Sequence, residues 1–194
     1  MNLAQRATWE DRHRAAAPSD AELSVTEMLP AICALHPHAL VLDLAAGTGR
    51  NAIALAHAGL RVVAIDFSIT ATRTLAAIAR RDRMPIYPIV ADLEAPIPIR
   101  PASFDLILNV NYLDRDLIPQ LVSAMRPGGL ILFDTFLIDE AGHGHLRDAR
   151  FTLEHYELRT LLAGLELLRY REGLTVYPTG KRAWRGAALA RRGS

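Results

Sequence analysis

The chain has 194 residues, a length that suits one domain. Hydrophobic residues make up 51% of it and charged residues 22%, so it can bury a core and is not generally disordered. With 22 Lys and Arg against 21 Asp and Glu, the formal net charge is +1. A protein built mainly to grip a phosphate backbone is more basic than this, so we expect no nucleic-acid partner.

Cysteine usage and the amino terminus point to a reducing compartment. Cys33 is the only cysteine, which excludes an intramolecular disulfide and a cysteine-based zinc cluster. The stretch from Met1 to Arg14 is polar with both charge signs and lacks the apolar run of a signal peptide. No run approaches the roughly 18 apolar residues of a membrane span. We therefore expect a cytoplasmic protein without a membrane partner or a metal site.

Along the chain, an apolar run, a turn and an amphipathic run alternate. Helices are predicted over residues 19–35 (interrupted or restarted at Pro30), 51–58, 68–80 and 117–125. Strands are predicted over residues 39–44, 61–65, 86–91, 104–110 and 130–136. This alternation predicts βαβ units and a doubly wound, mostly parallel α/β sheet.

The last part of the chain breaks that rhythm. A helix is predicted over residues 153–163, followed by strands over 165–171 and 183–191. No helix fits between these two strands, so they should pair antiparallel. We predict a single domain over residues 1–194, with an N-terminal helical cover or lid over 1–36 and a core over 37–194.

The strongest chemical signal is the turn after the first predicted strand. Gly47 and Gly49 allow the backbone to approach a ligand, and the helix that follows offers free N–H groups at its positive end. In open α/β sheets, ligands bind at the carboxyl ends of the strands. The next strand ends at Asp66, whose side chain can accept hydrogen bonds from both hydroxyl groups of a ribose.

Two classes of nucleoside cofactor fit this arrangement. Residues 47–52 satisfy the G-x-G-x-x-[GA] fingerprint of dinucleotide binding, which alone is a weak signal. Asp43 lies just before the turn, where its negative charge suits an ammonium group better than a pyrophosphate. Asp92, after the third strand, suits an adenine amino group. The closing hairpin also differs from a dehydrogenase half, so an NAD-dependent oxidoreductase is the less favoured alternative.

At these residues the chain resembles the class I S-adenosylmethionine (SAM)-dependent methyltransferases. The family pattern is an acid followed by small residues at alternate positions, here with Ala45 in place of the usual first glycine. Phe104–Leu108 and Arg126–Gly129 resemble later motifs of the family. The resemblance implies the strand order 3-2-1-4-5-7-6 with an antiparallel last strand. It also implies that SAM and its product S-adenosylhomocysteine (SAH) are bound by Asp43, Ala45, Gly47, Thr48, Gly49, Asn51, Asp66, Phe67, Ser68, Asp92, Leu93 and Asn109.

Within that family the chain looks most like the small bacterial tellurite-resistance and thiopurine-methyltransferase group. This finer resemblance is carried by the segments 42–51, 112–115, 134–136 and 170–173. Trp9 lies in a stretch similar to the N-terminal lid of these enzymes. DNA amino-methyltransferases carry two prolines after the fourth strand, and the stretch from Asn109 to Tyr112 has none, which disfavours a nucleobase substrate.

We therefore predict a methyltransferase that moves the methyl group of SAM to a small-molecule nucleophile such as a thiol or chalcogen. Tyr112 follows the fourth strand and His143 follows the fifth, so both are candidate catalytic residues. No residue has to serve as a general base, which agrees with a soft or already ionised nucleophile. A catalytically silent SAM-binding protein stays an alternative. The sequence decides neither the acceptor nor the oligomeric state.

Overall fold

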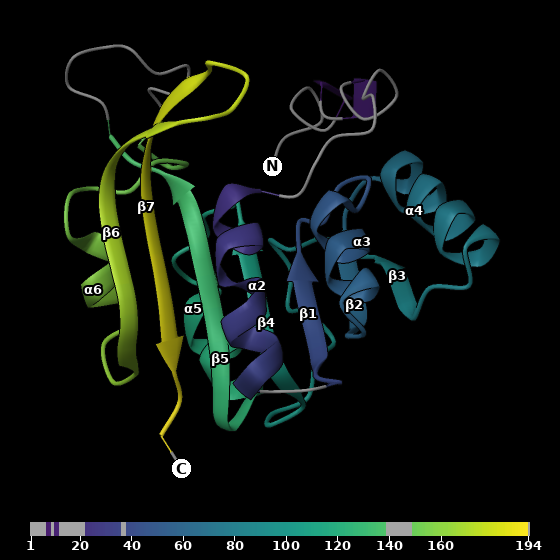
Figure 1. The fold of residues 1–194 in the computed structure, drawn as a ribbon, viewed down its shortest axis with the longest axis horizontal. Helices are drawn as coiled ribbons and strands as arrows, with labels where there is room; N and C mark the ends of the chain where they lie inside the picture. Colours follow the sequence, from purple (N-terminus) through teal and green to yellow (C-terminus); the bar gives the residue numbers. More distant parts are fainter. Residues whose placement is uncertain (1–6, 9, 12–21, 36–37, 139–148, 194) are drawn as a thin grey trace. The chain divides into compact units, whose positions relative to one another are not determined.

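In the computed structural model, residues 7–8, 10–11, 22–35, 38–138 and 149–193 are described (Figure 1). Contacts divide the chain into two compact units, residues 1–99 and 100–194. The strands form a seven-stranded mixed sheet in the order β3-β2-β1-β4-β5-β7-β6. This confirms the predicted fold class and strand order.

The first unit contains three parallel strands: β1 (Leu40–Leu44), β2 (Arg61–Asp66) and β3 (Ile86–Val90). Strand β1 is apolar and largely buried, as expected of a parallel strand covered on both faces. Three helices accompany these strands: α2 (Leu23–Leu35), α3 (Arg50–His57) and α4 (Ile69–Arg81). Helix α3 follows β1 and α4 follows β2, so each helix begins at the carboxyl end of a strand.

The second unit contains the parallel pair β4 (Phe104–Val110) and β5 (Met125–Phe136). Strand β7 (Arg182–Arg191) runs antiparallel to β5 and to β6 (Glu166–Val176). The short helices are α5 (Ile118–Ala124) and α6 (Glu157–Leu161). The predicted antiparallel closing hairpin is confirmed.

The helix predicted over residues 153–163 is wrong in its first half, because only Glu157–Leu161 is helical. Leu153 instead pairs with the end of β5: its N–H donates to the carbonyl of Phe136, and its carbonyl accepts from the N–H of Ile138. Tyr156 then adopts a left-handed conformation with φ of 64°. Long-range pairing therefore replaces the first turns of the predicted helix.

Two other elements differ from their predicted bounds because of contacts with distant residues. Strand β6 runs on to Val176 because it pairs with β7 over its whole length. Helix α2 continues through Pro30, with Val25, Met28 and Ile32 buried on one face. A buried stripe at this spacing holds a helix in place even where a proline removes one backbone donor.

Among the described residues, no helix is long and apolar enough to cross a membrane.

Candidate cofactor site

The turn between β1 and α3 is held in a tight left-handed path. Ala45, Gly47 and Gly49 have φ values of 50°, 56° and 88°. A Cβ atom on Gly49 would lie 2.2 Å from Cδ1 of Leu75 in α4, so only glycine fits at that position. The N–H of Ala46 donates to the carbonyl of Ile65 in β2. The sequence therefore forms a compact turn packed against the next βα unit.

Asp66, the last residue of β2, binds this turn directly. Its Oδ2 accepts a hydrogen bond of 2.8 Å from the N–H of Gly47, and its Oδ1 accepts one of 2.8 Å from the N–H of Ser68. Ser68 is the N-cap of α4, because its Oγ accepts from the N–H of Ala71. Asp66 is therefore a brace for the turn, and its carboxylate has further lone pairs for a ligand.

Asp43 in β1 is a buried acid with an open oxygen. The residue is 1% exposed, and within the described part of the chain its Oδ2 has no hydrogen-bond partner. Burial, followed by the charge of Asp66, raises the pKa of Asp43 to about 8, while Arg50 and a backbone hydrogen bond from Ala52 act in the opposite direction. An open, buried carboxylate oxygen is suited to a cationic hydrogen-bond donor.

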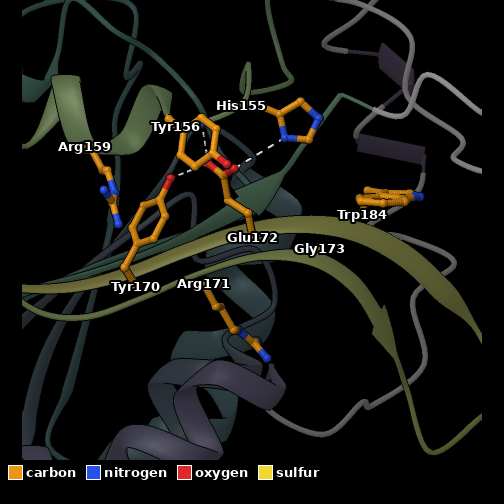
Figure 2. A pocket seen from close by; sticks show the side chains of 8 residues that line it. All are labelled: His155, Tyr156, Arg159, Tyr170, Arg171, Glu172, Gly173 and Trp184. Carbon is orange, nitrogen blue, oxygen red and sulfur yellow. Dashed lines mark hydrogen bonds and ion pairs between the residues drawn. The ribbon is translucent and has the colours of Figure 1, made fainter.

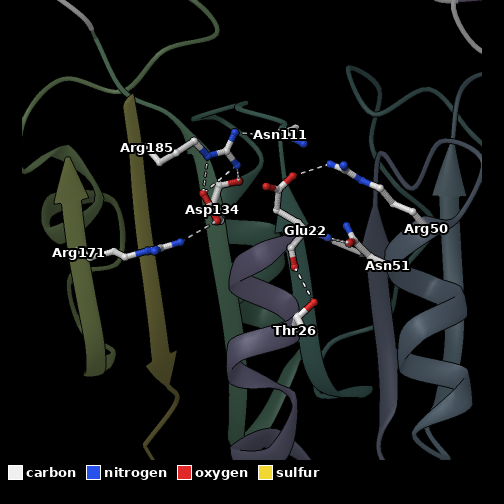
Figure 3. Close-up of polar contacts among 8 residues, drawn as sticks. All are labelled: Glu22, Thr26, Arg50, Asn51, Asn111, Asp134, Arg171 and Arg185. Carbon is white, nitrogen blue, oxygen red and sulfur yellow. Dashed lines mark hydrogen bonds and ion pairs between the residues drawn. The ribbon is translucent and has the colours of Figure 1, made fainter. Parts of the chain in front are cut away.

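The start of α3 is tied to α2 through side chains (Figure 3). Asn51, predicted as a cofactor residue, is 7% exposed, and its Oδ1 accepts a hydrogen bond of 2.8 Å from the N–H of Glu22. Arg50 forms an ion pair with the Glu22 carboxylate. Sequence reasoning missed Glu22 and Arg50, because the two residues are 28 positions apart and neither carries a local signal of its partner.

The third acid, Asp92, follows β3 and is half-buried. Its Oδ1 accepts a hydrogen bond from the N–H of Glu94, and Leu93 beside it is buried. Thr48 and Phe67 are half-buried in the loops after β1 and β2. The first unit thus carries its three predicted acids at or just past the carboxyl ends of three neighbouring strands.

In the second unit, Asn109 and Tyr112 lie at the end of β4. Asn109 is 1% exposed and donates from Nδ2 to the carbonyl of Tyr112 across 2.7 Å, so its side chain holds the turn after the strand. Tyr112 itself is half-buried. His143, the other predicted catalytic residue, lies outside the described residues.

A buried arginine lies beside the carboxyl end of β5 in the second unit (Figure 3). The side chain of Arg185 in β7 is 1% exposed and forms an ion pair of 2.8 Å with Asp134 in β5. It also donates to Oδ1 of Asn111 and lies over the ring of Phe136 at 4.6 Å. Sequence reasoning missed Arg185, although a charged residue inside an otherwise small and apolar predicted strand was an available signal.

A shallow pocket lies where α6 meets β6 (Figure 2). Glu172 accepts hydrogen bonds from the N–H of Tyr156, at 2.6 Å, and from the hydroxyl of Tyr170. Burial and the Glu172 carboxylate raise the pKa of Tyr170. Arg159 lies 4.6 Å from the centre of the Tyr170 ring. These contacts hold Tyr156 in its left-handed conformation and fix where α6 begins.

Residues 41–129 match the family model of a methyltransferase domain. Demethylmenaquinone methyltransferase of Renibacterium salmoninarum is 32% identical over 133 residues, which are 66% of this chain and 52% of that protein. Residues 41–129 of the chain are therefore a methyltransferase domain. An Eikenella corrodens protein named Hemagglutinin 1 is 31% identical over 138 residues, 69% of this chain and 46% of its own length. The chain thus spans about half the length of these relatives.

The structure of TehB from Haemophilus influenzae has the same fold, with a TM-score of 0.76 and 21% sequence identity. The match covers 95% of this chain and 67% of that one. The likeness to TehB is one of fold.

SAM is the cofactor that the similarity to methyltransferases implies, and SAH is its product. The first unit fits SAM because the buried Oδ2 of Asp43 is open to a cationic donor. Within the described residues, no three His, Cys, Asp or Glu side chains gather in a way that could hold a metal ion.

Proposed function

We propose that this chain transfers a methyl group from SAM to a small-molecule nucleophile. The observation that carries the proposal is the open, buried carboxylate oxygen of Asp43 beside the glycine turn. When bound, SAM supplies an electrophilic methyl group on a sulfonium ion. The protein then has to hold the cofactor and orient the nucleophile, and positioning alone can contribute roughly 7–11 kcal/mol.

Each acid of the first unit has a role in holding the cofactor. Asp43 accepts hydrogen bonds from the ammonium group, and Asp66 accepts them from the ribose hydroxyls. Asp92 and Leu93 contact the adenine. In support, Asp66 already binds the glycine turn, so its carboxylate is held in one orientation before a ligand arrives. A preorganised acceptor costs little ordering entropy on binding.

The N-terminal segment closes over this site as a lid. Among its described residues, Glu10 accepts a hydrogen bond from the N–H of Ile69 at the start of α4, across 3.1 Å. This helix start also holds down the pKa of Glu10, chiefly through the Thr70 hydroxyl. Trp9, the proposed apolar anchor, lies outside the described residues. A lid of this kind excludes water from the reaction.

The acceptor is a small thiol, chalcogen or similar nucleophile in the cytoplasm, not a nucleic acid. Tyr112 orients it, together with His143, which follows β5 in the sequence and lies outside the described residues. Asp134, the acid near the end of β5, forms an ion pair with the buried Arg185 and is therefore a poor general base. This supports an acceptor that needs no general base. A thiolate or an inorganic chalcogen anion arrives already ionised and reacts without proton removal.

Calorimetry tests the cofactor half of the proposal. The protein should bind SAM and SAH and give little heat with NAD. Asp43→Asn should weaken SAM binding, because the amide carries no charge to attract the ammonium. Glu27→Gln, at an exposed position on α2, serves as the matched control and should bind like the wild type. Tight NAD binding without SAM binding would overturn the assignment.

Methyl transfer itself is tested with SAM labelled in its methyl group. The purified protein is incubated with separate thiols, halides, phenols, selenite and tellurite, and the labelled product is measured. Transfer to one of the small acceptors, lost in Asp43→Asn, is the expected result. Binding of SAM with no transfer to any acceptor favours the catalytically silent alternative. Label recovered on RNA, DNA or protein contradicts the small acceptor.

A further inference from the structure

Glu22 fastens the start of α2 to the start of α3 (Figure 3). Its side chain is 4% exposed, and its Oε2 lies 2.6 Å from Nη2 of Arg50. The backbone N–H of Glu22 also donates a hydrogen bond to Oδ1 of Asn51. Arg50 comes directly after Gly49, the last residue of the glycine turn. The two bonds therefore connect α2 to the helix that begins at the cofactor turn.

Arg50 acts on two acids and forms an ion pair with one of them, Glu22. Its charge acts on Asp43, where it opposes the effects of burial and of Asp66 on the pKa. The ion pair of Arg50 is with Glu22. Within the described residues, Asp43 forms no ion pair. The charged groups that act on Asp43 are thus Asp66 from β2 and Arg50 from α3, with Glu22 holding the second of these.

The choice of partner by Arg50 matters for the ligand. A guanidinium group that moved onto the Asp43 carboxylate would occupy the same oxygen that an ammonium group needs. The Arg50 side chain is 33% exposed and carries several rotatable bonds, so it can change partners when one is removed. In the structure the Arg50 guanidinium is paired with the Glu22 carboxylate.

We infer that Glu22 is a positioning residue for the cofactor: by binding Arg50, it keeps the Asp43 carboxylate open for the ammonium group of SAM. This inference rests on the proposed role of Asp43. It assigns α2, an element outside the glycine motif, a part in cofactor affinity. It also makes the two halves of one ion pair act on Asp43 in opposite directions.

The test is the pH dependence of the SAM dissociation constant, measured by calorimetry across the range that brackets the titration of Asp43. Glu22→Gln should move the midpoint of the curve to lower pH, because Arg50 is released toward Asp43. It should also weaken SAM binding above the midpoint by about tenfold, the cost of competing with one charged hydrogen bond. Arg50→Gln should move the midpoint to higher pH, because the cation that favours ionised Asp43 is gone.

Opposite shifts separate this role from simple stabilisation, since both variants break the same ion pair. The loss of SAM affinity above the midpoint in Glu22→Gln separates it from the change of charge alone, because removing an acid and removing a cation shift a nearby pKa in opposite directions in any case. The amino group of SAM titrates alike in every experiment, so differences between variants report the protein. Glu22→Asp keeps the charge and should retain the wild-type midpoint. Glu27→Gln, at an exposed site on the same helix, is the control. Thermal unfolding without ligand identifies any variant that has lost its fold. If Glu22→Gln does not fold, the direction of the midpoint shift in Arg50→Gln still tests the inference.

The outcomes are distinguishable. If the wild type does not bind SAM, the proposed function fails and this inference fails with it. If the wild type binds SAM but the Glu22→Gln curve superimposes on that of Glu27→Gln, only the role of Glu22 is overturned. Shifts of the same sign in Glu22→Gln and Arg50→Gln also overturn it, because they mark the pair as structural alone.

Discussion

Oδ2 of Asp66 accepts a hydrogen bond of 2.8 Å from the backbone N–H of Gly47, so the acid that ends β2 holds the glycine turn that follows β1. Two neighbouring βα units are thereby joined at the point where the cofactor is proposed to bind. The same carboxylate is assigned to the ribose, which couples ligand affinity to the shape of the turn.

Asp66→Ala should reduce both SAM affinity and stability. We expect affinity to fall by about tenfold to a hundredfold as a charged acceptor is lost, and the free energy of unfolding to fall by about 1–3 kcal/mol. The second effect arises because the N–H groups of Gly47 and Ser68 lose their acceptor. Calorimetry and urea unfolding measure the two effects. Unchanged affinity with reduced stability would leave Asp66 as a brace only.

Asp43 should make stability depend on pH in a direction opposite to that of an ordinary acid. Its pKa rises from 3.8 to about 8 in the folded chain. Between these values the folded state retains a proton that the unfolded state has lost, so this contribution to stability is full at low pH and declines as pH rises. The expected slope is up to about 1.4 kcal/mol per pH unit.

Asp43→Asn should remove that slope, because an amide does not titrate. The measurement is urea unfolding of both proteins between about pH 4 and pH 8, the interval set by the two pKa values. The difference between their unfolding free energies reports Asp43, since the other titrating groups are shared. Parallel pH profiles for the two proteins would contradict a raised pKa.

Gly49→Ala should destabilise the chain more than Gly128→Ala does. Both glycines have positive φ, 88° and 75°, so both variants carry the left-handed penalty of about 1–2 kcal/mol. Only at Gly49 would the new methyl group meet Leu75, at 2.2 Å, whereas nothing lies within 4 Å at Gly128. Overpacking adds about 1–3 kcal/mol at Gly49. Urea unfolding should show that difference, and equal losses would mean that α4 moves aside freely.

Arg185→Leu should cost far more stability than Arg191→Leu, although both arginines lie in β7 and pair with an acid. Arg185 is buried with Asp134, and its loss leaves that buried carboxylate with only the longer ion pair to Arg171, at 3.8 Å, so the cost approaches the roughly 3–5 kcal/mol of a broken buried pair. Arg191 pairs with Glu166 at the surface, where a pair is worth about 0–1 kcal/mol. Thermal unfolding of the two variants gives the comparison. Similar losses would show that the Arg185 cluster is open to water.

Tyr112→Ala and His143→Ala should lower turnover more than they lower SAM affinity. This is the pattern of a lost acceptor or transition-state contact, and it is read from kcat/KM beside the dissociation constant of SAM. Asn109 holds the Tyr112 backbone, so Tyr112→Phe, which keeps the ring, separates loss of the hydroxyl from loss of packing. Normal turnover in both alanine variants would place the acceptor pocket elsewhere.

Local patterns were sufficient for much of the fold and for the candidate cofactor residues. The apolar run of β1 is buried on both faces, and Gly49 is needed where a Cβ atom would meet Leu75. Asp43 and Asp66 stand within or at the end of recognisable strands, so their place at one edge of the sheet follows from parallel pairing. Each of these features depends on neighbours in the sequence, and these are the features that a sequence displays.

The tertiary structure decided what depends on distant partners. Residues 153–156 are predicted from the sequence to be helical. Leu153 instead pairs with the end of β5, because its backbone groups gain hydrogen bonds there. Glu22 finds Arg50 at a separation of 28 residues, and Arg185 finds Asp134 at 51. Burial makes such pairs necessary, since an unpaired charge inside a protein is costly, but no local spacing records which partner folding will supply.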